Sequence, residues 1–308
     1  MPRTIAASLA VLAFSLACSN QRPIGPSGPL TDPIPPQTDP PILEERVLVG
    51  AGDIGWCGLP GAAATARLIE GIPGTVFTVG DNAYMRGTAR EFAECYEPFW
   101  GRFKNRTFPS PGNHEYETAG AMPYFSYFGA NAGPPGRGYY SYELGAWHIV
   151  SLNSEPEPRF SRGAHTAQLA WLRDDLTVNA GTACTAAYFH HPLYTSGPNH
   201  PQTHMREVYR TLYDFNVDVI VAAHDHLYER FAPQDAEGRL DLTRGIRQFV
   251  VGTGGATPYQ IGRRAPNSEA IANAHGVLKL TLRANEYLWQ FVAVPGDPVS
   301  DSGQERCH

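Results

Sequence analysis

The chain has 308 residues, of which 42% are hydrophobic and 18% are charged, and its formal net charge is −6. This length is enough to bury one large core or two small ones. The negative net charge gives no sign of the basic surface that binds nucleic acid. We therefore expect no nucleic-acid binding and disfavour a polyanionic partner.

The chain begins with a segment typical of exported proteins. Residues 1–17 contain one charge, Arg3, followed by an apolar stretch, which predicts a signal peptide. Cys18 comes directly after Ala17 and resembles the lipidated first residue of a bacterial lipoprotein. The rest of 18–43 is Pro-rich and predicts an extended tether. We expect a periplasmic or cell-surface lipoprotein, or otherwise a secreted protein, that meets a membrane only through this anchor.

Residues 44–308 are expected to form one domain, because no Pro-rich linker interrupts them. Short apolar, β-branched runs predict strands at 46–52, 75–80, 147–153, 185–190, 217–223 and 247–252, and a late antiparallel pair at 276–283 and 286–294. Helices are predicted at 60–70, 88–100, 164–178 and 203–215. Strands that alternate with helices early and follow one another late predict a layered α/β domain.

Four cysteines remain besides Cys18, and an even number in an exported chain permits two disulfides. Four cysteines allow three pairings. We favour Cys57–Cys95 and Cys184–Cys307, because the second would attach the C-terminal tail to the domain. Free buried thiols are the alternative.

Several predicted strands or loops lead through Gly or Ala into residues that can bind metal. The clusters are Gly52-Asp53, Gly80-Asp81 with Tyr84, Gly112-Asn113-His114-Glu115, His190-His191-Pro192 and His224-Asp225-His226. Loops at the C-terminal ends of strands are where α/β folds usually place their chemistry. Together these side chains can hold two ions, and their hard and borderline donors suit Fe, Mn, Zn or Mg. Asp81 is the natural bridge, because its two oxygens can serve one ion each.

Four further features of the sequence have simpler interpretations than metal binding. Gly252-Thr253-Gly254-Gly255 either forms only a tight turn or lets the backbone approach the site. His191 is expected to be structural or to line the site, and Asp225 is expected to point away from it. His148 is expected to be a surface histidine or one whose hydrogen bonds are satisfied.

The five clusters occur in the order and approximate spacing of the calcineurin-like metallophosphoesterases, which the chain resembles over residues 46–230. Tyr84, three residues after Asp81, resembles the purple acid phosphatase branch, as does the absence of a histidine in Asp53-Ile54-Gly55. The resemblance implies a layered α/β/β/α fold, in which two mixed sheets form a sandwich flanked by helices. One departure is Ala223, which stands where the family has Gly before the histidine pair.

The resemblance also implies two metal ions per chain, Fe(III) with Fe, Zn or Mn(II). The ligands it implies are Asp53, Tyr84 and His226 for the first ion, Asn113, His190 and His224 for the second, and Asp81 between them. It implies substrate contacts for His114, His200 and His204. His114 is the first choice for protonating the leaving group, with Glu115 orienting it, and His200 ranks above His204.

The expected reaction is hydrolysis of small phosphate monoesters by metal-bound hydroxide, as in an acid phosphatase. A phosphodiesterase acting on nucleotides or phospholipid headgroups is the alternative, because it would use the same metals and differ in the room for a second ester group. A non-catalytic phosphate-binding lipoprotein is disfavoured, because no ligand and no catalytic histidine is missing. The sequence does not predict the oligomeric state.

Overall fold

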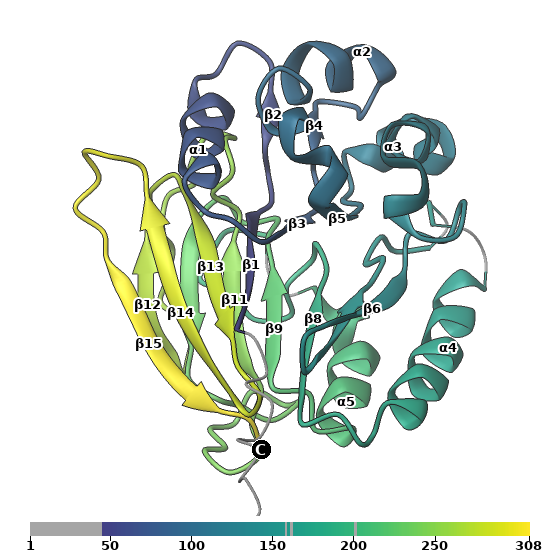
Figure 1. Ribbon diagram of the computed structural model, residues 1–308, viewed down its shortest axis with the longest axis vertical. Helices are drawn as coiled ribbons and strands as arrows, with labels where there is room; N and C mark the ends of the chain where they lie inside the picture. The colour runs from purple at the N-terminus through teal and green to yellow at the C-terminus, as the bar shows by residue number, and fades with distance from the viewer. Residues whose placement is uncertain (1–44, 158, 161–162, 200–201) are drawn as a thin grey trace, which may run out of the picture. The chain divides into compact units, whose positions relative to one another are not determined.

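Two mixed β-sheets pack face to face at the centre of the fold (Figure 1). The computed structural model describes residues 45–308, apart from 158, 161–162 and 200–201. The predicted signal peptide, the predicted lipidation site Cys18, the predicted tether and His200 lie outside the described residues. No described helix has both the length and the apolar character needed to cross a membrane.

The first sheet joins the beginning of the domain to its end. Its strands lie in the order β15 (Asp301–Arg306), β14 (Glu286–Ala293), β13 (Gly276–Leu282), β1 (Arg46–Ala51), β3 (Thr75–Val79) and β5 (Thr107–Ser110). β1, β3 and β5 are parallel, whereas β13, β14 and β15 pair antiparallel. The late antiparallel pair predicted from the sequence is therefore confirmed as β13 and β14.

The second sheet is also mixed. Its order is β12 (Ser268–Ala272), β10 (Tyr228–Phe231), β11 (Arg247–Val251), β9 (Val219–Ala222), β8 (Cys184–Tyr188), β7 (Trp147–Ser151) and β6 (Tyr140–Leu144). Strands β11, β9, β8 and β7 are parallel, and the strands at both edges are antiparallel. A small parallel pair, β2 (Gly55–Trp56) with β4 (Ala83–Tyr84), lies beside the first sheet's loops.

Helices cover the outer faces of the two sheets (Figure 1). The α-helices are α1 (Gly61–Glu70), α2 (Ala89–Glu91), α3 (Met122–Phe128), α4 (Ala164–Val178) and α5 (Arg206–Asp214). The short helical turns are η1 (Phe92–Tyr96), η2 (Trp100–Arg106), η3 (Glu115–Glu117), η4 (Ala119–Ala121), η5 (Gly129–Ala132) and η6 (Thr203–Met205). α1 packs on the first sheet, and α4 and α5 pack on the second. The predicted α/β sandwich is confirmed.

The central strands are apolar along their whole length because both of their faces are buried. In β9, Val219 and Val221 belong to the cluster between the sheets, whereas Ile220 and Ala222 pack toward the helices. This explains why the run at 217–223 predicted a strand without polar alternation.

The single helix predicted at 88–100 is wrong. Thr88 caps α2 with a reciprocal pair of hydrogen bonds to Glu91. The chain then forms the π-helical turn η1, in which Glu97 N–H donates to Phe92 O at 2.8 Å. Pro98 lacks the N–H that a continuing helix needs, so the chain starts again as the 3₁₀ helix η2. The helix predicted at 203–215 likewise begins with a 3₁₀ turn, η6, before α5.

Both favoured disulfides are present in the structure, Cys57–Cys95 and Cys184–Cys307. The second joins β8 to the residues after β15, as expected for a bond that attaches the C-terminal tail. The closed segment spans 123 residues, so this bond removes much conformational freedom from the unfolded chain.

His148 is buried between two carboxylates from different elements. Its Nδ1 lies 2.7 Å from Glu143 Oε1 on β6, and its Nε2 lies 2.7 Å from Asp175 Oδ2 on α4. Burial lowers the pKa of His148, but the hydrogen bonds to Asp175 and Glu143 outweigh burial and raise that pKa above its usual value. The expectation of a satisfied histidine is confirmed, and the protonated ring joins the sheet edge to α4.

We expect His148→Gln to lower the free energy of unfolding by on the order of 2 kcal/mol near pH 6, because hydrogen bonds to charged groups contribute about 1.5–3 kcal/mol. A raised folded-state pKa stabilises the protein below the unfolded pKa of about 6.5, and this contribution is lost as the pH rises through the folded value. Urea unfolding of both proteins near pH 6 and near pH 9 measures the difference. A difference that stays constant or grows with pH would contradict this role.

Candidate metal centre

The site forms where the C-terminal ends of parallel strands from both sheets meet. Asp53 follows β1 and Asp81 follows β3 in the first sheet, while His190 follows β8 and His224 follows β9 in the second. Because parallel strands end at the same edge of a sheet, side chains distant in sequence come together there. All seven predicted ligands lie at this edge.

One group of donors surrounds the Tyr84 phenol. Tyr84 donates to Asp53 Oδ1 at 2.5 Å and lies 3.1 Å from Asp81 Oδ2. The Nε2 atom of His226 lies 3.2 Å from the same phenol oxygen and 3.3 Å from Asp53 Oδ1. This group is the one predicted for the first ion.

A second group of donors surrounds His190 Nε2. Asn113 Oδ1 lies 3.0 Å from it, His224 Nδ1 lies 3.2 Å away and Asp81 Oδ2 also lies 3.2 Å away. Asp53, Asp81 and His190 each offer a ligand atom within 4.8 Å of the others. The residues predicted for the second ion are therefore adjacent to the first group, and Asp81 belongs to both.

Asp81 meets the two groups through one oxygen rather than two. Oδ2 faces both Tyr84 and His190, whereas Oδ1 accepts the backbone N–H of His114 at 2.9 Å. The expectation that each oxygen would serve one ion is therefore wrong for this geometry. The hydrogen bond to Oδ1 fixes the carboxylate so that Oδ2 points between the groups.

Two of the imidazoles are oriented by backbone carbonyls. His190 Nδ1 lies 2.8 Å from Val79 O, and His226 Nδ1 lies 2.8 Å from Thr257 O. A carbonyl accepts only an N–H, so in both rings Nδ1 carries a proton and Nε2 is the nitrogen that faces the other donors. Donor types and ring orientations therefore fit the two-metal set implied by the sequence.

Burial and close charges perturb these groups strongly. Burial raises the pKa of Asp53 and Asp81, but the nearby His226 and His190 outweigh burial, and both carboxyls have pKa values below their usual range. Burial lowers the pKa of His190, yet Asp81 raises it to about 10. Burial and the charge of His190 lower the pKa of His224 to about 4. The carboxylates are held as anions and His224 as a neutral ring, the forms that bind cations.

Three of these residues have left-handed backbone angles that are unusual outside glycine. The φ angles are 58° at Asp53, 50° at Asp81 and 67° at His224. Hydrogen bonds hold these conformations, because Asp53 N–H donates to Gly80 O at 3.1 Å and His224 N–H donates to Asp53 Oδ2 at 2.9 Å. Half of the described non-glycine residues with positive φ angles therefore carry donors of this site.

Glycines give the backbone room to approach the site. A Cβ at Gly252 would lie 2.1 Å from Asp225 O and 2.7 Å from Asp53 Oδ2, so this turn does approach the site, as one of the two interpretations predicted. A Cβ at Gly52 would lie 2.6 Å from the Ala223 methyl. Ala223, the departure from the family pattern, therefore fits because Gly52 leaves the space for its methyl group.

Glu115 holds the loop that carries Asp81. Its carboxylate is fully buried and accepts the N–H groups of Asp81 at 2.9 Å, Asn82 at 2.8 Å, Ala83 at 3.2 Å and Gly112 at 2.7 Å. Burial and the charge of Asp81 raise the pKa of Glu115, and these N–H groups oppose the rise. The expectation that Glu115 orients His114 is replaced, because both of its oxygens bind this backbone.

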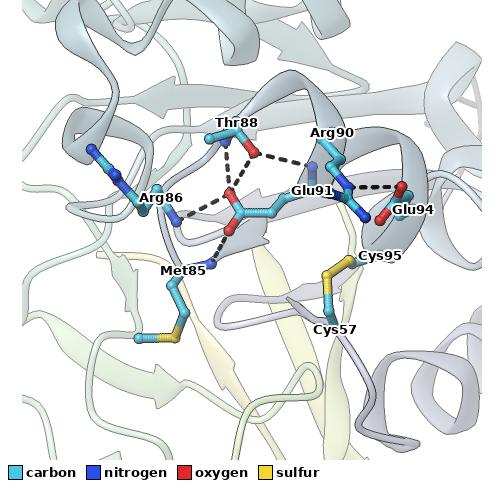
Figure 2. Close-up of a disulfide and its surroundings, with 8 residues drawn as sticks. All are labelled: Cys57, Met85, Arg86, Thr88, Arg90, Glu91, Glu94 and Cys95. Carbon is cyan, nitrogen blue, oxygen red and sulfur yellow. Dashed lines mark hydrogen bonds and ion pairs between the residues drawn. A yellow bond between two sulfur atoms is a disulfide. The ribbon is translucent and has the colours of Figure 1, made fainter.

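Glu91 holds the next part of the same loop (Figure 2). Its carboxylate accepts the N–H groups of Met85 at 2.6 Å, Arg86 at 3.1 Å and Thr88 at 2.8 Å. Burial raises the pKa of Glu91, but these bonds, Thr88 first, outweigh burial and lower that pKa. Two glutamates thus bind the backbone on both sides of Tyr84.

The Cys57–Cys95 disulfide lies next to this loop (Figure 2). Cys57 follows β2, just after Asp53, and Cys95 lies in η1, after the loop that carries Tyr84. The bond therefore joins the two segments that supply most of the first donor group.

His114 lies on the more open side of the donor groups. Its side chain is 23% exposed, its Nε2 lies 3.8 Å from Asp81 Oδ2, and its ring centre lies 4.4 Å from that of Tyr84. Its Nδ1 lies 2.5 Å from Met85 O, so Nδ1 carries a proton and Nε2 faces the site. This position fits the predicted role in proton transfer or phosphate contact.

His204 is separated from the predicted ligands by His191. His204 Nε2 lies 2.9 Å from Ser154 O, and its ring centre lies 5.4 Å from that of His191. His191 is buried, lies 3.0 Å from Ser154 Oγ through Nδ1, and has its ring centre 4.5 Å from that of His224. His191 forms a structural hydrogen bond and also lines the site, so both roles expected for it are present. His200 lies outside the described residues.

Sequence reasoning missed two aromatic neighbours of the ligands. Tyr259 stacks on His226, with ring centres 3.9 Å apart and an interplanar angle of 13°, and its N–H donates to His226 O at 2.9 Å. Trp56 stacks on Tyr84 at 5.0 Å. Tyr259 follows the Gly252–Gly255 turn by a few residues, and only that proximity could have suggested it.

Asp225 is fully buried, and one of its oxygens accepts Asn199 N–H at 3.1 Å.

The comparisons with known proteins agree with this geometry. The model of the calcineurin-like phosphoesterase family matches residues 47–228. Purple acid phosphatase 23 of Arabidopsis thaliana is 31% identical over 216 residues, 58% of this chain and 46% of that protein. Human acid phosphatase type 7 is 28% identical over 249 residues, 68% of this chain and 55% of that protein. The chain thus spans about half the length of these relatives.

Two solved structures share the fold. The purple acid phosphatase PPD1 from yellow lupin has a TM-score of 0.70 at 19% identity, over 85% of this chain and 54% of that one. GAP50, the anchor in the inner membrane complex of Plasmodium, has a TM-score of 0.68 at 14% identity, over 86% of this chain and 89% of that one. At these identities the similarity concerns the fold alone, and it agrees with the predicted layered sandwich.

We expect Glu115→Gln to lower the free energy of unfolding by about 1–3 kcal/mol, because the new amide NH₂ must face backbone N–H donors. The loss of this clamp should also displace Asp81 and reduce the metal retained per chain after dialysis. Urea unfolding and elemental analysis measure the two effects.

Glu117→Gln is the matched control, because Glu117 lies two residues along on the surface, paired with Arg159 at 2.9 Å. It should change neither quantity measurably. Equal behaviour of the two variants would show that Glu115 does not position the loop.

Proposed function

The chain belongs to the calcineurin-like phosphoesterase family, and we propose that it is a purple acid phosphatase-like enzyme that hydrolyses small phosphate monoesters with two metal ions. The observation that carries the proposal is the shared position of Asp81 Oδ2, which lies within 3.2 Å of both Tyr84 OH and His190 Nε2. Two donor groups with one carboxylate in common are what a pair of ions about 3.5–4 Å apart requires.

Asp53, Tyr84 and His226 would hold one ion, Asn113, His190 and His224 would hold the other, and Asp81 would contact both. Bound there, the ions would supply a nucleophile from water and neutralise charge on the phosphoryl oxygens. The Tyr84 hydroxyl donates a hydrogen bond to Asp53, so binding a cation at the phenol oxygen must displace the hydroxyl proton.

His114 completes the arrangement from the exposed side. Met85 O holds the Nδ1 proton, so the ring can present only Nε2 to a substrate. From there His114 would protonate the leaving alkoxide or donate to a phosphate oxygen. His204 would contact only a part of the substrate far from the metals, because Ser154 O and the His191 ring lie between it and the donor groups.

Tyr84 supports Fe(III) as one of the two ions, because a phenolate is a hard ligand that suits a hard trivalent cation. The second ion would be Fe, Zn or Mn(II), because its donors are two imidazoles, an amide oxygen and the shared carboxylate. The names of the relatives, acid phosphatases, support monoesters over diesters as the substrate.

We expect Asp81→Asn to reduce hydrolysis of an aryl phosphate by about a thousandfold or more, because one shared ligand would be lost from both ions. Asp297→Asn, at an exposed position far along the chain, is the matched control and should retain full activity. Wild-type protein should hydrolyse the mono-aryl ester faster than the bis-aryl ester. Full activity of Asp81→Asn would contradict the mechanism, and a faster rate on the bis-aryl ester would contradict monoester specificity.

We also propose export with lipidation at Cys18. Residues 1–17 support this, and so do two disulfides, which persist mainly in oxidising compartments. Mass spectrometry of protein from the native host should find a mature chain that begins with a lipid-modified Cys18. A chain that retains Met1 would contradict export, and an unmodified mature N-terminus would contradict the anchor.

A further inference from the structure

A second cleft, of about 700 Å³, lies apart from the metal centre. Its walls come from Leu193–Thr195, the first residue of α5, the loop between β10 and β11, and Arg263–Pro266. Neither His114 nor any of the seven predicted metal ligands lines it. Small-molecule sites usually have volumes of about 300–1,000 Å³, so this cleft has a suitable size.

The cleft is positively charged in a chain whose net charge is −6. Arg206, Arg263 and Arg264 line it, against one carboxylate, Glu237. That carboxylate is already shared with Arg210 at 3.2 Å and Arg239 at 3.4 Å. Within residues 45–308 as described, Arg206 and Arg263 form no ion pair of their own, so both guanidinium groups are available to an anion.

One wall of the cleft is apolar and rigid. The Tyr194 hydroxyl donates to Ala236 O at 2.8 Å, and its ring contacts Tyr209 edge to face at 5.8 Å. The ring also lies against Gly238, where an added Cβ would be 2.8 Å from Tyr194 Cε1. Leu193 and Pro266 extend this surface. A fixed aromatic and aliphatic wall suits the apolar body of a ligand.

A buried donor at the cleft lacks an acceptor. Gln234 lines the cleft and is only 4% exposed. Its Oε1 accepts from Asn267 Nδ2 at 3.1 Å, whereas its Nε2 has no hydrogen-bond partner among the described residues. Buried polar groups are nearly always paired, so the unpaired amide makes this end of the cleft polar.

We propose that this cleft binds a small organic anion, with an aromatic or aliphatic body and a carboxylate or phosphate head group. The body lies on the Tyr194 wall, and the head group meets Arg206 and Arg263. The site is independent of the metal centre, because the two share no side chain that binds a ligand.

Calorimetric titration of the metal-loaded, full-length protein with 1-naphthoate, and with the neutral 1-naphthalenemethanol, tests the proposal. The wild type should bind the anion at least tenfold more tightly than the alcohol. Arg206→Gln/Arg263→Gln should weaken naphthoate binding at least tenfold, whereas Arg67→Gln/Arg173→Gln, which changes two exposed arginines outside the cleft, should leave it unchanged.

Equal binding of the acid and the alcohol by the wild type would overturn the proposal without any variant. So would naphthoate binding that persists in the cleft variant, because the anion would then bind elsewhere, for example on the metals. The thermal unfolding midpoint of each variant should match that of the wild type, since all four arginines are exposed.

Discussion

The position of one carboxylate organises the site. Asp81 Oδ2 faces both donor groups while Oδ1 accepts the His114 N–H and the backbone has a left-handed φ of 50°. Glu115 supports that backbone by accepting four N–H groups of the surrounding segments. A buried carboxyl group that binds only backbone N–H groups thus fixes the Asp81 carboxylate among histidines. The position of Asp81, which would contact metal, therefore depends on Glu115, which would not.

This arrangement requires both sheets. β1 and β3 deliver the carboxylates from one sheet, and β8 and β9 deliver the imidazoles from the other. The apolar layer between the sheets sets their spacing and therefore the distance between acids and imidazoles. The predicted ligands lie just past the strand ends, where the Cys57–Cys95 bond and the glycines at close approaches limit the possible loop conformations.

The sequence predicted most of this because the relevant signals are local. The run at 217–223 predicts a buried strand, and the motifs predict the candidate ligands that follow such strands. Strand β15, Asp301–Arg306, has no apolar pattern and forms through its pairing with β14, so it was missed. Tyr259 and the role of Glu115 depend on contacts between distant segments. The single-oxygen contact of Asp81 was missed for the same reason, because it depends on the His114 N–H.

Anomalous diffraction from crystals of the metal-loaded protein, collected at the Fe, Zn and Mn absorption edges, tests the central claim most directly. We expect two peaks about 3.5–4 Å apart, both within about 2.0–2.3 Å of Asp81 Oδ2, with iron at the peak beside Tyr84. A single peak, or two peaks of which only one contacts Asp81, would contradict the account.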